Sequence, residues 1–328
     1  MSSASASASS VPVATTTLPA ASATHGRALR LRRDKEEIDE YRVKHGYHMY
    51  LVPSSNKSDK AFLLIMGPSE THYQYAPFLF RVDLPHNYPN SPPRCEYLSV
   101  SGHRIHPNIY AEGKVCLSIL GTWRGPGWKA SMGLNTLALN LYSLLNTSNP
   151  LSCEPGFEQE EDNPSSRSHN YNKFVKFVSF IDLTSIYCNA EKVIPPEDEA
   201  SNVVNIYLKQ YLKRKLSAIE RYGERLYNEN GNKQYTSEIY GASKIKLTRE
   251  TKDRVITYLR AAVEREFPHE DYTRHQLNEV EFQVEKPENK DTDGNNGQEG
   301  ETGSVHTEDS SPIYYSDQGF PDESDSDE

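Results

Sequence analysis

Cys116 lies in a stretch whose residue types could support acyl transfer, HPNIYAEGKVCLSIL over residues 106–120. It follows Asn108 by eight positions, and the turn-forming segments AEG and GTWRGPG flank it. A nucleophilic thiol needs access and thiolate character, whereas a structural cysteine is usually buried and inert. We predict that the loop holds the sulfur at a fixed place on the surface. Its expected core anchors are Val115, Leu117, Ile119 and Leu120.

Two chemistries compete for a reactive Cys116. A hydrolase would need a histidine base, His103 or His106, with Asn108 as a third member. A histidine packed against a His-Pro-Asn turn is, however, more often structural. A transferase that holds an acyl group as a thioester needs a donor for the oxyanion and an acid that aligns the attacking amine. Asn108 can be that donor, but these residues alone leave an ordinary packed cysteine open.

Composition and charge narrow the class of protein. The 328 residues suffice for about two domains, and 36% hydrophobic content allows a core. The net charge of −10 belongs to the end of the chain, because residues 285–328 hold fourteen acids and two lysines. The four irregularly spaced cysteines predict neither a disulfide framework nor a metal site. We expect no membrane segment and no nucleic-acid partner, and a cytoplasmic or nuclear location.

The elements that must position this loop follow from periodicity. Residues 27–41 predict a helix with Leu29, Leu31, Ile38 and Tyr41 as apolar positions, and its arginines precede its acids, against the helix dipole. Short β-rich runs, typical of an antiparallel meander, cover residues 47–53, 60–68, 77–85 and 94–100. A long loop over 101–129 precedes further helices at 135–146, 167–190, 201–227 and 248–266. The opening Ser/Ala-rich segment resembles an organellar transit peptide only superficially, and we favour a disordered leader.

Four motifs in order resemble the ubiquitin-conjugating enzymes. They are Gly67-Pro68, Tyr88-Pro89 with Pro92-Pro93, His106-Pro107-Asn108, and Cys116. The segments GKVCLSILGTWRGPGW and SLLNTSNPLSCEPGFEQE look like the large Z-type members of that family. The resemblance covers about residues 27–230. It implies an α+β ubiquitin-conjugating (UBC) fold, with a four-stranded antiparallel meander sheet flanked by helices and a C-terminal helical extension.

Composition and this resemblance together predict four segments, and the resemblance implies a set of site residues. The segments are a disordered leader (1–25), the UBC catalytic core (26–160), the helical extension (161–268) and an acidic disordered tail (269–328). Cys116 would accept ubiquitin or a ubiquitin-like modifier from an activating enzyme that has spent ATP, with no bound cofactor, and would pass it to a lysine amine. Asn108 would support the oxyanion or hold the loop, and Glu154 sits near the family's gate acid. The expected structural residues at the site are His106, Pro107 and Trp128.

The resemblance also predicts partners. A basic first helix that docks the activating enzyme is matched by Arg27, Arg30, Arg32 and Arg33. Protein substrates and, where one assists, a ubiquitin ligase complete the expected set. Asn90 and the Trp128-Lys129-Ala130-Ser131 run replace apolar residues of the usual ligase surface, so common ligase recruitment is in doubt. Two alternatives remain: an inactive ubiquitin-binding module of the same fold, which lacks the cysteine in known variants, and a cysteine hydrolase that cleaves isopeptides without ATP.

Overall fold

Four strands form an antiparallel sheet in which each strand pairs with its sequence neighbour, as the sequence predicts. They are β1 (Met49–Pro53), β2 (Lys60–Met66), β3 (Pro77–Asp83) and β4 (Arg94–Tyr97). Leu51 pairs with Leu63 across the first two strands, and Phe80 pairs with Tyr97 across the last two. The computed structural model describes residues 20–98, 101–189, 194–241 and 243–267. The predicted tail and most of the predicted leader lie outside these residues.

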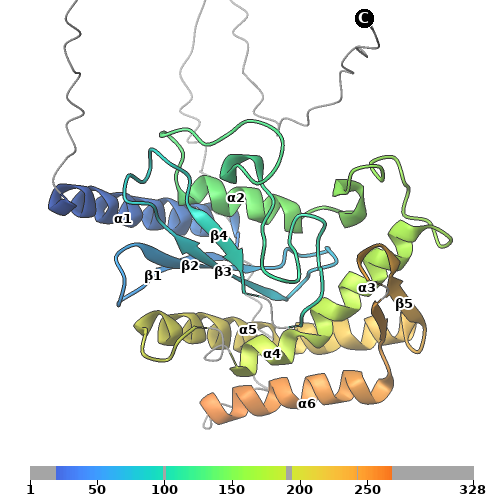
Figure 1. The fold of residues 1–328 in the computed structure, drawn as a ribbon. Helices are drawn as coiled ribbons and strands as arrows, with labels where there is room; N and C mark the ends of the chain where they lie inside the picture. The colour runs from blue at the N-terminus through green and yellow to red at the C-terminus, as the bar shows by residue number, and fades with distance from the viewer. Residues whose placement is uncertain (1–19, 99–100, 190–193, 242, 268–328) are drawn as a thin grey trace, which may run out of the picture. The chain divides into compact units, whose positions relative to one another are not determined.

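Both faces of this sheet are covered by helices (Figure 1). On one face lie α1 (Ala20–His45) and α2 (Leu134–Leu145), and on the other α4 (Leu183–Asn189) and α5 (Glu199–Asn230). The six residues of β2 from Ala61 to Met66 are all buried, because neither face meets water. This explains why that strand is a continuous apolar run rather than an alternating one.

The first helix differs from its predicted pattern in two ways. It begins at Ala20, and Leu29 is 55% exposed, while Leu31 and Ile38 are buried as expected. Arginines near the N-terminus of a helix are unfavourable because that end of the helix dipole is positive. Ion pairs between these arginines and acids one turn later offset this cost. These pairs are Arg30–Asp34, Arg32–Glu36 and Arg33–Glu37.

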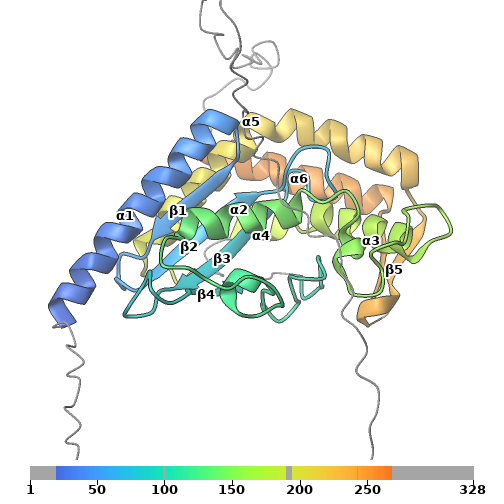
Figure 2. The ribbon, with the colours of Figure 1, turned by 90° about the horizontal axis from the view of Figure 1, so that it is seen from above.

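The C-terminal segment contains the predicted helices and one element that the sequence did not predict. The helix expected over 167–190 is divided at Asp182 into α3 (Arg167–Ile181) and α4, and the last helix is α6 (Arg249–Glu266). Between α5 and α6 a hairpin of β5 (Gln234–Ser237) and β6 (Ser243–Lys246) lies along α3 (Figure 2). Its polar, partly exposed strands resemble loop sequence, which is why periodicity missed them.

The sheet and the C-terminal helices share one interior. Buried residues from residues 26–160 and from residues 161–268 belong to a single apolar cluster. Tyr50 of β1 stacks on Tyr207 of α5 with ring centres 4.4 Å apart. Asp198 caps α5 and also accepts hydrogen bonds from Ser54 Oγ and the Ser55 amide, at 2.5 and 3.0 Å. No helix in the described part of the chain is long and apolar enough to cross a membrane.

Candidate active site

Cys116 and Asn108 are joined by reciprocal hydrogen bonds. The Cys116 amide donates to the Asn108 carbonyl at 2.8 Å, and Asn108 Nδ2 donates to the Cys116 carbonyl at 3.0 Å. Short bridges between His106 and Ile109 and between Ile109 and Val115 tighten the same loop. The loop therefore fixes a side-chain amide donor beside the backbone of the cysteine.

His106 is a structural residue of this loop. It is fully buried, and its Nδ1 accepts a hydrogen bond from the Asn108 amide at 3.0 Å. Burial, with a smaller effect of the Arg104 charge, lowers the pKa of His106 to about 3. His103 packs edge-on against Phe174, with ring centres 5.4 Å apart. No histidine hydrogen-bonds to the Cys116 thiol in the described part of the chain, so nothing favours the hydrolase alternative.

The sulfur is not at the surface, which corrects the sequence-based expectation. Cys116 is 1% exposed. Its predicted anchors do pack into the core: Val115, Leu117 and Ile119 are buried and Leu120 is partly buried. Beyond them the chain reverses at Gly121, where φ is 69°, and returns so closely that a Cβ on Gly125 would lie 3.0 Å from Ser118 Cβ. We call residues 121–127 the return loop. It packs against Ser118, two residues after the cysteine.

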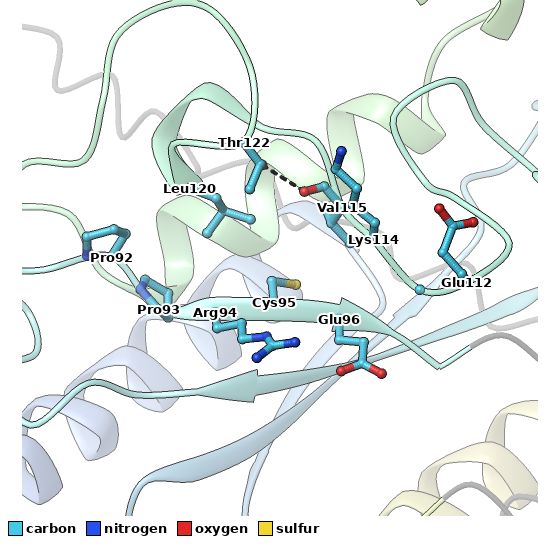
Figure 3. A pocket seen from close by; sticks show the side chains of 11 residues that line it. Pro92, Pro93, Arg94, Cys95, Glu96, Glu112, Lys114, Val115, Leu120 and Thr122 are labelled. Atoms are coloured by element: carbon cyan, nitrogen blue, oxygen red, sulfur yellow. Dashed lines mark hydrogen bonds between the residues drawn. The ribbon is translucent and has the colours of Figure 1, made fainter.

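Thr122 fastens the return loop to both neighbours of the cysteine. Its Oγ1 donates to the Val115 carbonyl at 2.7 Å and accepts from the Leu117 amide at 3.0 Å. Figure 3 shows the first of these bonds beside a pocket of about 500 Å³ between this loop and β4. Cys95 lines that pocket, and burial raises the pKa of its thiol. The raised pKa disfavours the reactive thiolate form of Cys95.

Glu154 lies near the His-Pro-Asn turn, and its carboxylate already contacts two other side chains. It follows the short helix η2 (Pro150–Cys153). Its Oε2 accepts from the Tyr240 hydroxyl at 2.5 Å and lies 3.4 Å from Arg104 Nη2. The same Arg104 nitrogen donates to the Pro107 carbonyl at 2.5 Å. That Glu154 aligns a substrate lysine stays a prediction.

Sequence reasoning missed Arg104 and Tyr240. Arg104 stands just before the His-Pro-Asn motif, so its place in the chain was a usable signal. Tyr240 lies 86 positions after Glu154, in the hairpin that periodicity did not detect. Burial, followed by the hydrogen bond to Glu154, raises the pKa of Tyr240, so its hydroxyl remains protonated and donates.

Trp128 ties the end of the site loop to the Tyr-Pro-x-x-Pro-Pro segment. Its Nε1 donates to the Pro89 carbonyl at 2.6 Å, and its ring centre lies 6.1 Å from that of Tyr88. The Pro107 carbonyl accepts from Arg104, as described above. Both contacts are consistent with the structural roles predicted for Trp128 and Pro107.

The four arginines predicted to dock the activating enzyme differ in their exposure to solvent. Arg27 is 9% exposed, with Nε 3.4 Å from the Ser58 carbonyl, and Arg30 pairs at 2.9 Å with fully buried Asp34. The side chains of Arg32 and Arg33 are 79% and 70% exposed. Arg27 contacts Ser58 outside α1, and the Arg30 guanidinium lies against Gly133, where an added Cβ would be 2.1 Å from it. The docking prediction therefore depends on Arg32 and Arg33. No group of three or more His, Cys, Asp or Glu residues that could hold a metal occurs among the described residues.

The fold and the site together define an α+β domain that holds one cysteine in a loop cross-bonded to an asparagine amide. Residues 30–178 match the family model for ubiquitin-conjugating enzymes, so this segment of the chain is a domain with the UBC fold of that family. Ubiquitin-conjugating enzyme E2 Z of Xenopus tropicalis is 42% identical over 39% of this chain and 41% of its own length. The Homo sapiens protein of that name is 41% identical over 37% of this chain and 35% of its own. This chain thus spans less than half of these relatives. The solved structure of human ubiquitin-conjugating enzyme E2 G1 is 27% identical over 36% of this chain and 93% of its own, with a TM-score of 0.31.

Proposed function

We propose that this chain is a ubiquitin-conjugating enzyme that carries ubiquitin or a ubiquitin-like modifier as a thioester on Cys116. The modifier comes from an activating enzyme, which consumes the ATP, and leaves to a lysine amine of a protein substrate. The reciprocal hydrogen bonds between Cys116 and Asn108, in a domain of this family, are the observation that carries the proposal. Its relatives named E2 Z support the same activity.

The site can perform both transfers with its own residues. In loading, the Cys116 thiolate attacks the thioester carbonyl of the modifier held by the activating enzyme, whose thiol leaves. In discharge, a lysine amine attacks the carbonyl carbon of the new thioester, the C–S bond breaks, and the departing Cys116 thiolate takes up the proton that the amine loses. Asn108 Nδ2 already lies 3.0 Å from the Cys116 carbonyl, so a small rotation would bring this donor toward the oxyanion, which forms on the thioester carbonyl bonded to the Cys116 sulfur. Removing one such donor typically costs about 100-fold in rate.

The exposed arginines of α1 supply a surface for the activating enzyme. Arg32 and Arg33 share a helix face with exposed Leu29, so the face offers charge around an apolar contact. We propose this face, rather than Arg27 or Arg30, as the docking site. A ligase and protein substrates in the cytoplasm or nucleus complete the proposed setting.

A thioester assay tests the proposed function. The full chain is incubated with activating enzyme, ATP and ubiquitin, and separated without reductant beside Cys116→Ala and a matched control, Cys95→Ala. We expect an ATP-dependent band heavier by one modifier, removed by added thiol, absent in Cys116→Ala and retained in Cys95→Ala. A band that survives in Cys116→Ala contradicts the proposal, as does the lack of a band with ubiquitin and with every other modifier and its own activating enzyme.

A further inference from the structure

A cluster of five side chains joins the C-terminal extension to the active-site turn. We name it the Arg104 cluster, and its members are Arg104, Tyr110, Glu154, Tyr171 and Tyr240. The Arg104 guanidinium lies between two rings, 3.6 Å from the centre of Tyr110 and 4.0 Å from the centre of Tyr240. Tyr171 donates its hydroxyl to the Arg104 carbonyl at 3.0 Å. The arginine is therefore held by stacking on both faces and by its own backbone.

The cluster draws on both parts of the chain. Arg104, Tyr110 and Glu154 come from the catalytic core, near the His-Pro-Asn turn. Tyr171 lies on α3, and Tyr240 ends the short helix η4 (Glu238–Tyr240) of the hairpin. The Arg104 and Glu154 side chains are only 17% and 25% exposed, so each needs its partners to offset lost hydration. Tyr240 serves both, because its ring stacks on the arginine and its hydroxyl donates to the carboxylate.

We propose that Tyr240 is a positioning residue for the transfer step, which makes the C-terminal extension part of the active site. This inference rests on the proposed function. Tyr240 fixes Arg104 and Glu154, and Arg104 in turn holds the Pro107 carbonyl at 2.5 Å. Pro107 precedes Asn108 directly, so the direction of the Asn108 amide toward Cys116 depends on this chain of contacts. Tyr240 acts on the turn through Arg104 and Glu154, and not through a contact with the thiol.

The two contacts of Tyr240 can be removed separately. Tyr240→Phe keeps the ring over Arg104 and deletes only the hydrogen bond to Glu154, whereas Tyr240→Ala deletes both. Tyr235→Phe is the matched control, because it also removes a tyrosine hydroxyl from the hairpin. That hydroxyl donates to Asn230 Oδ1 at 3.2 Å and does not contact the His-Pro-Asn turn. Glu154→Gln is the conservative partner variant, since its amide oxygen still accepts from Tyr240.

Single-turnover discharge of the loaded full-length chain to free lysine measures the effect. We expect Tyr240→Phe to lower the maximal rate about tenfold, the scale of one lost hydrogen bond to a charged acceptor, with an unchanged half-saturating lysine concentration. Tyr240→Ala should lower it further, Glu154→Gln less than Tyr240→Phe, and Tyr235→Phe not at all. Combining Tyr240→Phe with Glu154→Gln should add little, because both act on one contact.

Hydrogen exchange at the Asn108 and Cys116 amides gives a second readout that needs no modifier. We expect faster exchange at both amides in Tyr240→Phe and no change in Tyr235→Phe. If the wild-type chain loads, and Tyr240→Phe changes neither the discharge rate nor the hydrogen exchange, the positioning role is wrong and the proposed function stands. A wild-type chain that never loads overturns the proposed function instead, and hydrogen exchange then still decides whether Tyr240 controls the turn. Should Tyr240→Ala fail to fold, Tyr240→Phe decides the outcome.

Discussion

At the scale of single residues, different side chains of the site hold the loop in shape and carry out the chemistry. His106 is buried and neutral, and its ring nitrogen is occupied by the Asn108 amide. The Asn108 carbonyl and side-chain amide each form a hydrogen bond with the backbone of Cys116. The imidazole thus serves as an acceptor that shapes the turn, and proton transfer at the thiol does not depend on it.

His106→Asn tests this role, because asparagine keeps an acceptor near the position of Nδ1. The pKa of His106 is about 3 in the folded chain, below its ordinary value of 6.5, so only the unfolded chain gains a proton as pH falls through this range. Folding stability is therefore lost as pH falls below 6.5, by about 2 kcal/mol at pH 5. We expect His106→Asn to flatten this loss in urea unfolding and to keep loading within severalfold of wild type.

The control for that experiment is His86→Asn, which alters an exposed histidine. It should leave the pH dependence of unfolding as in wild type. A general-base role would be indicated if His106→Asn abolished loading while the chain remained folded.

At the scale of elements, we expect the return loop to limit access to the buried thiol, because it packs against Ser118 beside the cysteine. Gly125 has φ of 125°, which L side chains rarely adopt, and an added Cβ would meet Ser118. We expect Gly125→Ala to displace the loop from Ser118 and to raise the rate of Cys116 alkylation by iodoacetamide severalfold. Gly46→Ala is the control, because it carries similar backbone strain at φ 68° with no atom within 4 Å of the added Cβ. Equal alkylation rates in all three chains would show that the loop does not limit access.

Asp182, the residue between α3 and α4, makes the stability of the fold depend on pH. Burial raises the pKa of Asp182 to about 6, and a hydrogen bond from Ser101 opposes this only partly. The folded chain therefore keeps the proton that the unfolded chain loses between about pH 4 and 6, so stability falls as pH rises through that window.

Asp182→Asn keeps an acceptor for Ser101 and cannot ionise. We expect it to raise the free energy of unfolding by about 3 kcal/mol at pH 7, and to change it little at pH 4. Asp59→Asn, at an exposed site, is the matched control for the loss of charge. Urea titrations at both pH values measure the difference, and an equal effect of Asp182→Asn at pH 4 and pH 7 would rule out this explanation.

At the scale of the whole described molecule, the extension replaces solvent on one face of the sheet. Tyr50 meets Tyr207, Tyr75 meets Tyr222, and Tyr187 donates to the Tyr75 carbonyl at 3.1 Å. Asp198 adds polar bonds to the turn between β1 and β2. Burial alone would raise the pKa of Asp198, but the hydrogen bonds from Ser54, Ala200 and Ser55 hold it below its ordinary value. Its stabilising effect is therefore present at neutral pH and is lost in acid.

Asp198→Ala tests how firmly the extension is joined to the sheet. We expect a loss of about 2 to 3 kcal/mol at pH 7, because the change removes a helix cap and the charged acceptor of the Ser54–Ser55 turn. Thr248→Ala is the matched control, since Thr248 caps α6 by accepting from the Thr251 amide. It should cost about 1 kcal/mol. Equal shifts in the urea midpoint would show that the inter-element bonds of Asp198 contribute nothing.

The sequence by itself determined the local features of this protein. Short β-rich runs bounded by turn residues identified the four strands, and the motif from His106 to Cys116 identified the site loop, because these signals arise between near neighbours in the chain. Only the tertiary structure decided that Cys116 is buried, that Arg27 and Arg30 are engaged, and that Tyr240 reaches Glu154 from 86 positions away. Burial and long-range contact depend on which surfaces meet after the helices pack, and no periodicity in one sequence records that choice.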